Sequence, residues 1–228
     1  MRRALRTLSS VLIISGCLLL LDAGLTLLWQ EPVSAVYAKY NQDALAGDLD
    51  DLEQLNALQL RALSQLRTEQ QRIAFLARAL RRRAREGDAI GRIRIARINA
   101  SFVFVQGTRP ASLRKGPGRY PDTTFPGLRG TIAVAGHRTT YLAPFRRIDE
   151  LRRGDRIVLE MPYARFTYRM EQQRIVDPDA YEFVTRRRGY ERLALTACHP
   201  LYSARQRIVV FARLAKVEAL GAARVPSG

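Results

Sequence analysis

The chain has 228 residues, 47% of them hydrophobic, so it is long and apolar enough for one domain with a buried core plus appendages. The formal net charge is +17, and arginine supplies nearly all of the basic excess. Such a charge would suit nucleic acid, anionic lipid or an anionic cell envelope, but no RNP, zinc-knuckle or helix-turn-helix signature accompanies it, and we expect no nucleic-acid partner. The two cysteines, Cys17 and Cys198, lie far apart in the sequence, which argues against a disulfide framework.

The first part of the chain predicts a membrane anchor. Residues 11–29 contain one charged side chain, Asp22, and a helix of this length spans roughly 28 Å, close to the thickness of a hydrocarbon core. Arginines precede this run at positions 2, 3 and 6, whereas the residues that follow it are nearly balanced in charge. The asymmetry predicts a cytoplasmic N-terminus, residues 1–10, and a single pass that places the rest of the chain outside the plasma membrane.

Two other interpretations of this segment are less favoured. A cleaved signal peptide has an apolar region of about 7 to 15 residues, which is shorter than this run. The stretch "ISGC", residues 14–17, is similar to a lipoprotein box, but leucines follow Cys17 where a lipidated N-terminus has a polar stretch. We therefore expect a retained anchor in which Cys17 is buried.

Residues 30–87 predict a helical stalk or linker. No proline occurs between Pro32 and Pro110, and apolar side chains recur with helical spacing. These side chains are Leu52, Leu55, Ala62, Leu66, Ile73, Leu76 and Leu80. The segment starts acidic and ends basic, as the helix dipole favours. We expect one long amphipathic helix that holds the next domain off the membrane; dimerisation as a coiled coil stays an alternative, although the heptad pattern is interrupted.

After Gly87 the pattern changes to short alternating stretches separated by Gly, Pro and Asp turns. The stretches "SFVFV", "TIAVAG", "DRIVLE", "RFTYRM", "RLALTAC" and "RIVVFARL" have the alternation of strands. This alternating pattern predicts a mainly β domain over residues 88–214, a small barrel or sandwich of about 130 residues. A C-terminal tail is expected at 215–228.

Nucleophilic chemistry by a cysteine is the most specific function that the residues indicate. The stretch "TACHPLYSARQR" places Cys198 between two predicted strands, and a lone thiol outside the cytoplasm is more often reactive than structural. A thiolate that attacks an acyl group needs a proton donor for the leaving amine and a cation or dipoles for the oxyanion. His137, in "VAGHRTTY", follows an apolar strand and is the expected partner. His199 is adjacent to Cys198 and should point to the opposite face.

Two arginines near the cysteine are candidates for the cation. Arg205 and Arg207 share the same strand parity, but Arg207 opens the strand "RIVVFARL" and would be held more rigidly, so we favour Arg207. We expect no metal and no cofactor, because the two histidines and two cysteines have none of the zinc-ligand spacings. Calcium has no Asp/Glu cluster to support it.

The order His137, Cys198 and Arg207, on a mainly β domain after an N-terminal anchor, resembles the sortases, cysteine transpeptidases of the Gram-positive cell surface. In that family the histidine ends an "AGH" strand, the nucleophile ends a "TLTTC"-like strand, and an essential arginine opens the next strand, nine residues on in several classes, as here. The resemblance spans residues 88–214 and implies a closed β-barrel of about eight strands. The stretches "GHRTTYLAPFRRIDELRRGD" and "CHPLYSARQRIVVFARL" are similar to class E, the actinobacterial type.

The resemblance also implies a reaction and its partners. Cys198 would attack the Thr-Gly carbonyl of an exported protein with a Leu-Ala-X-Thr-Gly or Leu-Pro-X-Thr-Gly sorting signal. His137 would protonate the departing glycine amine, and Arg207 would stabilise the oxyanion or bind the signal backbone. An amine of a peptidoglycan precursor or of a pilin would then resolve the thioacyl enzyme.

Three residues are candidate substrate contacts on the same grounds. Tyr141 matches the tyrosine associated with the alanine-containing signal, and Thr196 and Ala197 lie beside the nucleophile. The family's threonines four residues and one residue before the cysteine are Ala194 and Ala197 here. The missing hydroxyls bear on rate or signal preference and remove no catalytic group.

Two other classes stay open. A cysteine protease that hydrolyses could use the same residues, although "TACHP" is not the caspase pattern and no asparagine follows Asn99 to serve a papain-like site. An anchored binding domain would keep the barrel with Cys198 inert. Alkylation at neutral pH separates this last class from either enzyme, because a buried structural cysteine resists it.

Overall fold

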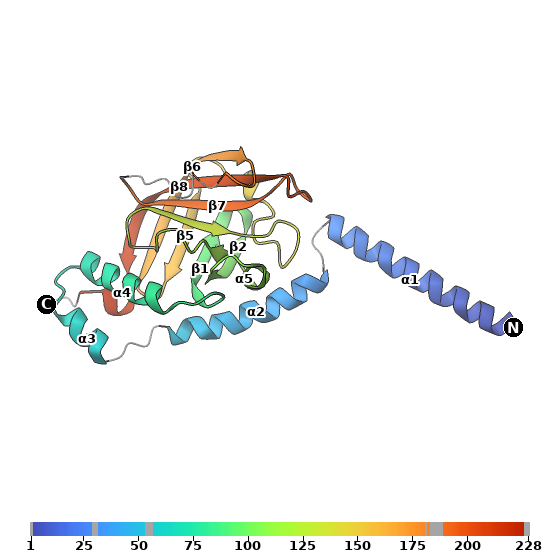
Figure 1. Cartoon of the computed structure of the whole chain (residues 1–228), viewed down its shortest axis with the longest axis horizontal. Coiled ribbons are helices and arrows are strands. Elements are labelled where there is room, and N and C mark those ends of the chain that lie inside the picture. The colour runs from blue at the N-terminus through green and yellow to red at the C-terminus, as the bar shows by residue number, and fades with distance from the viewer. Residues whose placement is uncertain (1, 29–31, 53–56, 181, 183–188, 226–228) are drawn as a thin grey trace.

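The computed structural model describes residues 2–28, 32–52, 57–180, 182 and 189–225. Four helices precede the strands: α1 (Arg2–Leu28), α2 (Pro32–Asp51), α3 (Ala57–Ser64) and α4 (Glu69–Arg83). Trp29 and Leu55, which the sequence assigned to the anchor and the stalk, lie outside the described residues. α1 extends away from the rest of the molecule (Figure 1), and its window Leu5–Leu25 has a mean hydropathy of 2.1 with no part buried, so it is a candidate membrane span.

The strands close into a barrel, which confirms the predicted fold class. The strands are β1 (Ala89–Ile95), β2 (Ala100–Gln106), β3 (Gly118–Arg119), β4 (Thr131–Ala135), β5 (Arg156–Met161), β6 (Ala164–Val176), β7 (Arg192–His199) and β8 (Gln206–Ala219). Their order around the barrel is β1-β2-β3-β4-β7-β8-β6-β5, with β5 paired back to β1. The pairs β2–β3 and β4–β7 are parallel, and β7–β8 is antiparallel. A short helix, α5 (Pro110–Lys115), connects β2 to β3.

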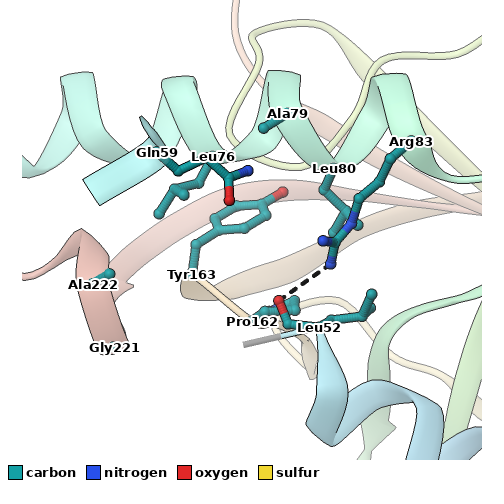
Figure 2. Close-up of a pocket in the computed structure, with 10 residues that line it drawn as sticks. All are labelled: Leu52, Gln59, Leu76, Ala79, Leu80, Arg83, Pro162, Tyr163, Gly221 and Ala222. Atoms are coloured by element: carbon teal, nitrogen blue, oxygen red, sulfur yellow. Dashed lines mark hydrogen bonds between the residues drawn. The ribbon is translucent and has the colours of Figure 1, made fainter. Parts of the chain in front are cut away.

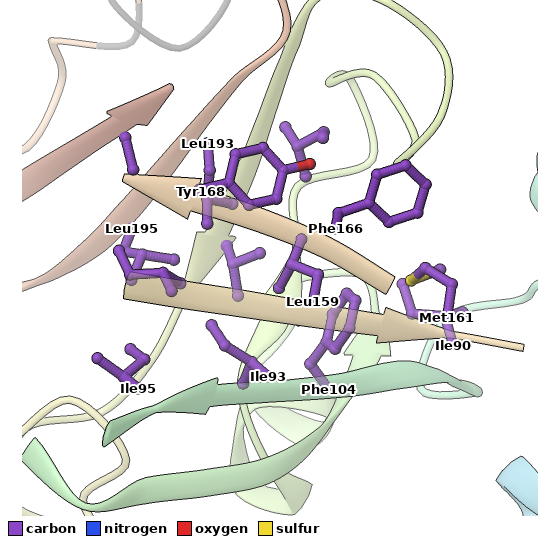
Figure 3. Close-up of a cluster of buried hydrophobic side chains, with 14 of the residues drawn as sticks. Ile90, Ile93, Ile95, Phe104, Leu159, Met161, Phe166, Tyr168, Leu193 and Leu195 are labelled. Carbon is purple, nitrogen blue, oxygen red and sulfur yellow. The ribbon is translucent and has the colours of Figure 1, made fainter. Parts of the chain in front are cut away.

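Alternation along the strands fills the interior of the barrel. Figure 3 shows part of this cluster, where Ile93 of β1, Leu159 of β5 and Leu195 of β7 lie together. Burying each such side chain contributes about 1.5–3 kcal/mol. In β7 the inward residues include Leu193 and Leu195, whereas Ala194 between them belongs to a second, separate cluster. The two faces of β7 therefore have different surroundings: one faces the barrel interior and the other faces outward.

The predicted stalk differs from the single long helix that the sequence suggested. α4 begins at a capping box, in which the Thr68 hydroxyl accepts from the Gln71 N–H and the Gln71 side chain accepts from the Thr68 N–H. Its apolar residues are buried in the main core of the barrel: Ile73, Leu76, Ala77 and Leu80. An apolar stripe of this width needs a partner face, and the barrel supplies it. Helices from the region before residue 88 thus pack with the barrel, and β8 continues to Ala219, past the expected end at residue 214.

α4 meets the C-terminal part of the chain at the short helix η3 (Gly221–Ala223). Figure 2 shows Tyr163 pointing toward the face of α4 that carries Leu76, and the Arg83 guanidinium donating to the Leu52 carbonyl at 3.2 Å. The cavity among these side chains measures about 90 Å³. Small-molecule sites occupy roughly 300–1,000 Å³, so this cavity is a packing gap between helix and barrel.

Candidate active site

Cys198 lies at the end of β7, directly opposite Arg207 of β8. The antiparallel register pairs Cys198 with Arg207 and His199 with Gln206. Side chains of directly opposite residues project to the same face, with Cβ atoms roughly 4.5–5.5 Å apart. The fold therefore brings the thiol and the arginine stem together and directs His199 to the other face.

His137 follows β4, which flanks β7 on its other edge. The parallel register ends at Ala135 opposite Thr196, and the Gly136 N–H donates to the Thr196 carbonyl at 3.0 Å. His137 and Cys198 each come two residues after this pair, so both reach the same end of the sheet. The Phe145 N–H donates to the His137 carbonyl at 3.0 Å and fixes the backbone where the loop begins. Three adjacent strands thus bring the three candidate catalytic residues to one end of the barrel.

The Cys198 side chain lies on the outer face of the sheet, because Ala194, Thr196 and Cys198 alternate with the inward residues of β7. Ala194 packs with Ala133, Val209 and Phe211, and Tyr120 and Val176 cover this cluster. The Thr196 hydroxyl is buried and lies 3.0 Å from the Tyr120 phenol oxygen, with which it shares a hydrogen bond. Thr196 therefore faces the same side as the nucleophile, while its hydroxyl is occupied within the protein.

Ala197 has different surroundings from the other sequence-predicted residues. It belongs to the interior core with Leu193 and Leu195 and is buried. The structure therefore does not bring the Ala197 side chain to the face that carries Cys198. A threonine at this position would place its hydroxyl in the barrel interior.

The environment of His137 favours the neutral imidazole. Burial lowers the pKa of His137 below its ordinary value of 6.5, and the nearby Arg114 guanidinium lowers this pKa further. Both causes act against the imidazolium, since one removes water and the other adds a like charge. The lowered pKa thus favours the neutral imidazole at pH 7, which is the form that can accept a proton.

Arg207 is half-buried and held by the loop that joins β7 to β8. Its Nη1 donates to the Ala204 carbonyl at 2.9 Å and to the Gln206 carbonyl at 3.0 Å. Among the described residues the guanidinium donates to carbonyls of this loop and forms no ion pair with a carboxylate. A cation held by carbonyl oxygens keeps its charge available to an anion that forms at Cys198.

Tyr141 lies against His137 and also contacts α2. The two rings are 5.1 Å apart and tilted by 48°. The Tyr141 N–H donates to the Ser34 hydroxyl at 2.9 Å, and the ring of Tyr37 meets that of Tyr141 edge-on at 6.4 Å. The structure thus places the predicted substrate contact beside the predicted general acid, next to the first turns of α2.

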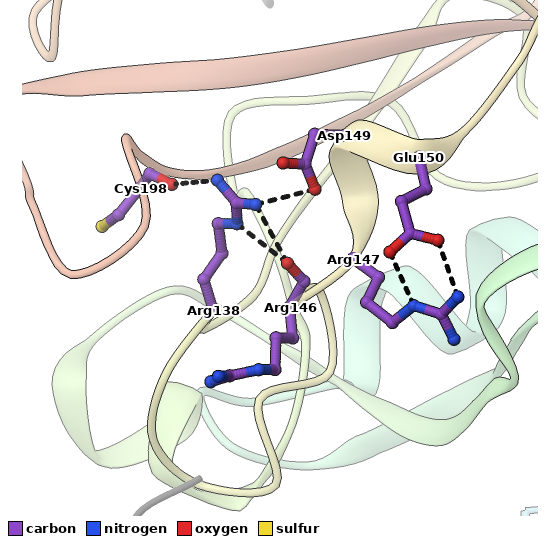
Figure 4. A network of polar contacts seen from close by, with 6 residues as sticks. All are labelled: Arg138, Arg146, Arg147, Asp149, Glu150 and Cys198. Carbon is purple, nitrogen blue, oxygen red and sulfur yellow. Dashed lines mark hydrogen bonds and ion pairs between the residues drawn. The ribbon is translucent and has the colours of Figure 1, made fainter. Parts of the chain in front are cut away.

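Arg138 is a residue of the site that sequence reasoning missed. It is only 4% exposed, and its guanidinium donates twice to the Arg146 carbonyl, at 3.2 and 3.0 Å. It also pairs with Asp149 at 2.7 Å and lies 3.5 Å from the Cys198 carbonyl oxygen. Figure 4 shows this carbonyl facing Arg138 and the Cys198 sulfur turned away. Its position after His137 was visible in the sequence, but no pattern there indicates that this arginine is buried.

No metal site accompanies these residues in the part of the chain that the structure describes. No three His, Cys, Asp or Glu side chains there are grouped as ligands would be.

The sequence profile of the sortase domain matches residues 93–215, more than half of the chain, and the chain therefore belongs to the sortase family. It is 40% identical over 114 residues to sortase D of Bacillus subtilis, an alignment that covers 50% of this chain and 56% of that protein. The solved structure of sortase E from Streptomyces avermitilis is 32% identical, with a TM-score of 0.53 over 61% of this chain and 99% of that one. A Clostridium perfringens sortase D5 transpeptidase has a TM-score of 0.63 over 78% of this chain and 99% of that chain, at 20% identity, and supports the fold.

Proposed function

We propose that the chain is a membrane-anchored cysteine transpeptidase that cleaves a sorting signal between Thr and Gly and transfers the acyl group to an amine. One observation carries this proposal: neighbouring strands bring His137, Cys198 and Arg207 to one end of a sortase barrel. These are the nucleophile, the proton carrier and the cation that thioester chemistry requires. The α1 helix would be the anchor, with residues 1–10 cytoplasmic and the barrel outside.

The first half-reaction transfers the acyl group to sulfur. The Cys198 thiol gives its proton to the neutral His137 imidazole, and the thiolate attacks the threonine carbonyl carbon. The tetrahedral oxyanion that forms is stabilised by Arg207. When it collapses, the C–N bond breaks, His137 returns the proton to the departing glycine amine, and a thioester joins the substrate to Cys198.

The second half-reaction regenerates the enzyme. The amine of the acceptor attacks the thioester, His137 takes its proton, and the C–S bond breaks with the proton passing to sulfur. An amide replaces the original one, so no oxidant, reductant or metal enters the balance. We propose that the acceptor is an amine of a peptidoglycan precursor or of a pilin and that the substrate is an exported protein.

Two alternative sorting signals follow from the sequence resemblance. The sequence favours Leu-Ala-X-Thr-Gly through Tyr141, which lies 5.1 Å from the His137 ring, with Leu-Pro-X-Thr-Gly as the competitor. We propose that Tyr141 lines the signal pocket.

The test is cleavage of the two peptides by the full chain in detergent micelles, followed by mass spectrometry with and without an amine acceptor. We expect a thioester adduct on Cys198, cleavage between Thr and Gly, and an amine-dependent ligated product. Cys198→Ala should abolish all three, and Cys17→Ser should change none. Cleavage without any ligated product would indicate a hydrolase, and absence of an adduct would indicate a binding domain.

Matched variants test the individual roles. Removing an oxyanion-stabilising group costs about 10²–10³ in kcat, so Arg207→Gln should lose activity on this scale. Arg205→Gln, in the adjacent loop, should not. His137→Gln should likewise be inactive and His199→Gln active. Equal losses within either pair would contradict the assignment.

A further inference from the structure

The first turns of α2 carry an apolar stripe that the barrel does not cover. Val33, Val36 and Tyr40 are 74%, 73% and 76% exposed, and Tyr37 beside them is 49% exposed. These residues have the i, i+3, i+4, i+7 spacing of one helix face. An exposed apolar stripe in an otherwise well-packed protein indicates a contact with a further partner.

The orientation of this stripe is fixed by the opposite face of α2. Ala38 and Leu45 are buried there, and Leu45 packs with Val103 of β2. The Gln42 side chain accepts from the Val103 N–H at 2.7 Å and donates to the Val103 and Lys115 carbonyls, both at 2.8 Å. These bonds attach α2 to the edge of the barrel, so rotation of the helix cannot bury the stripe without breaking them.

The place of the stripe in the chain indicates which partner it meets. α1, the candidate membrane span, ends at Leu28, and α2 starts at Pro32 close to that end (Figure 1). The stripe from Val33 to Tyr40 covers roughly 10 Å of helix, on the order of the interfacial layer outside a hydrocarbon core. Valine with tyrosine is suited to this layer, because tyrosine combines an apolar ring with a polar tip.

The charge along α2 limits the contact to its first turns. Lys39, next to the stripe, lies 4.0 Å from Asp43 in an exposed ion pair, which contributes little, so its ammonium can turn to anionic headgroups. Exposed carboxylates follow at Asp43, Asp48 and Asp50, where the helix turns acidic. Acidic side chains are repelled by an anionic surface, so the second half of α2 would leave the membrane.

We propose that the Val33–Tyr40 stripe binds the outer surface of the lipid bilayer and holds the candidate active site against the membrane. The inference rests on the proposed anchoring by α1. Ser34 and Tyr37 of the same turns contact Tyr141, whose ring lies 5.1 Å from that of His137. His137 thus lies within a few side chains of the lipid surface, where a membrane-bound substrate would present its signal.

The test uses the full chain in vesicles of phosphatidylcholine and phosphatidylglycerol. Trp29 is the sole tryptophan, so Trp29→Phe provides a silent background. Tyr40→Trp in that background reports on the stripe, and Val36→Trp repeats the measurement one turn earlier. Asp48→Trp, an exposed site two turns further along the same helix, is the matched control. Tryptophan emission and its quenching by lipids with brominated acyl chains are then compared.

We expect the Tyr40→Trp and Val36→Trp chains to emit at shorter wavelength in vesicles and to lose most of their fluorescence to brominated lipid. The Asp48→Trp chain should keep solvent-like emission. Flotation of vesicles with the protein reports on anchoring separately. If the chain floats and the stripe variants behave like Asp48→Trp, the inference is wrong and the anchor stands. Blue-shifted but unquenched emission would indicate contact with a second copy and would also overturn it. Failure to float would overturn both the anchor and the inference.

Discussion

Replacing Arg138 by methionine tests the buried network beneath the candidate site. The substitution retains much of the volume of the side chain and removes its donors. The Arg146 carbonyl then loses two hydrogen bonds, at 3.2 and 3.0 Å, and such a loss costs about 1–3 kcal/mol. Asp149 is 46% exposed and returns to water, so the lost ion pair adds at most about 1 kcal/mol. We expect the free energy of unfolding to fall by about 1–4 kcal/mol.

The assay is thermal unfolding of the full chain in detergent, followed by near-ultraviolet circular dichroism. For a chain of this size 1 kcal/mol shifts Tm by about 2–4 °C, so Arg138→Met should lower Tm by roughly 2–16 °C. Arg147→Met is the matched control, because Arg147 lies in the same region and forms an ion pair of the same length, 2.7 Å, with Glu150 while both are exposed. We expect almost no change in Tm there.

The comparison of the two variants decides the argument. If Arg138→Met and Arg147→Met have the same Tm, the buried guanidinium stabilises the fold no more than an exposed ion pair does. The hydrogen bonds of Arg138 would then contribute nothing measurable to the stability of the fold. Arg138→Met should also lower the kcat for peptide cleavage at temperatures where it is fully folded, because the guanidinium connects the backbone of Cys198 to the loop after His137.

Three further predictions concern the core and pH. Ala197→Thr restores the residue common in the family but puts a hydroxyl into the barrel interior, and it should lower the free energy of unfolding by about 1–3 kcal/mol in denaturant titration. The pKa of His137 is lowered by burial, so its NMR titration in Cys198→Ala should have a midpoint below 6.5. The folded state should keep its full stability above pH 6.5 and lose part of it as the pH falls from 6.5 through the pKa of the folded state. His137→Gln should remove this dependence. The pKa of Glu191 is raised by burial, so its stabilising contribution is complete below pH 4.5 and is lost as pH rises; Glu191→Gln should exceed the parent Tm at pH 8 and match it near pH 4. A lower Tm for Glu191→Gln at pH 8 would contradict this reasoning.

The barrel could be predicted because strand alternation is a local signal. The stretches that alternate in the sequence became strands, and the family resemblance is confirmed by the match over residues 93–215. The packing of α4 could not be predicted, since an apolar stripe does not reveal whether a barrel or a second helix will cover it. Ile73 and Leu76 lie in the main core because a barrel face happens to lie opposite.

In the candidate site, too, features set by neighbouring residues could be predicted, whereas features set by residues distant in the sequence could not. Alternation correctly separates His199 from Cys198, because neighbours in a strand face opposite sides. The same rule predicts that the Ala197 side chain points into the barrel, as observed. Ala197 was expected to contact substrate only because of its sequence position beside the nucleophile. Arg138 could not be recognised, because its burial depends on Arg146 and Asp149, which close over it only in the folded chain.

The loop after His137 depends on a contact with α2, the helix that follows the candidate membrane span. Tyr141, Leu142 and Ala143 all have left-handed backbone, with φ of 52°, 62° and 42°. Residues with a Cβ avoid this region at a cost of roughly 1–2 kcal/mol each, so the loop needs support from outside itself. The Ser34 hydroxyl supplies part of it by accepting from the Tyr141 N–H, and Ser34 belongs to α2. A fragment that begins at residue 88 lacks both this support and α4, so its activity would measure a barrel with an altered His137 loop. α2 is therefore part of the candidate active site, in addition to following the candidate membrane span α1 in the chain.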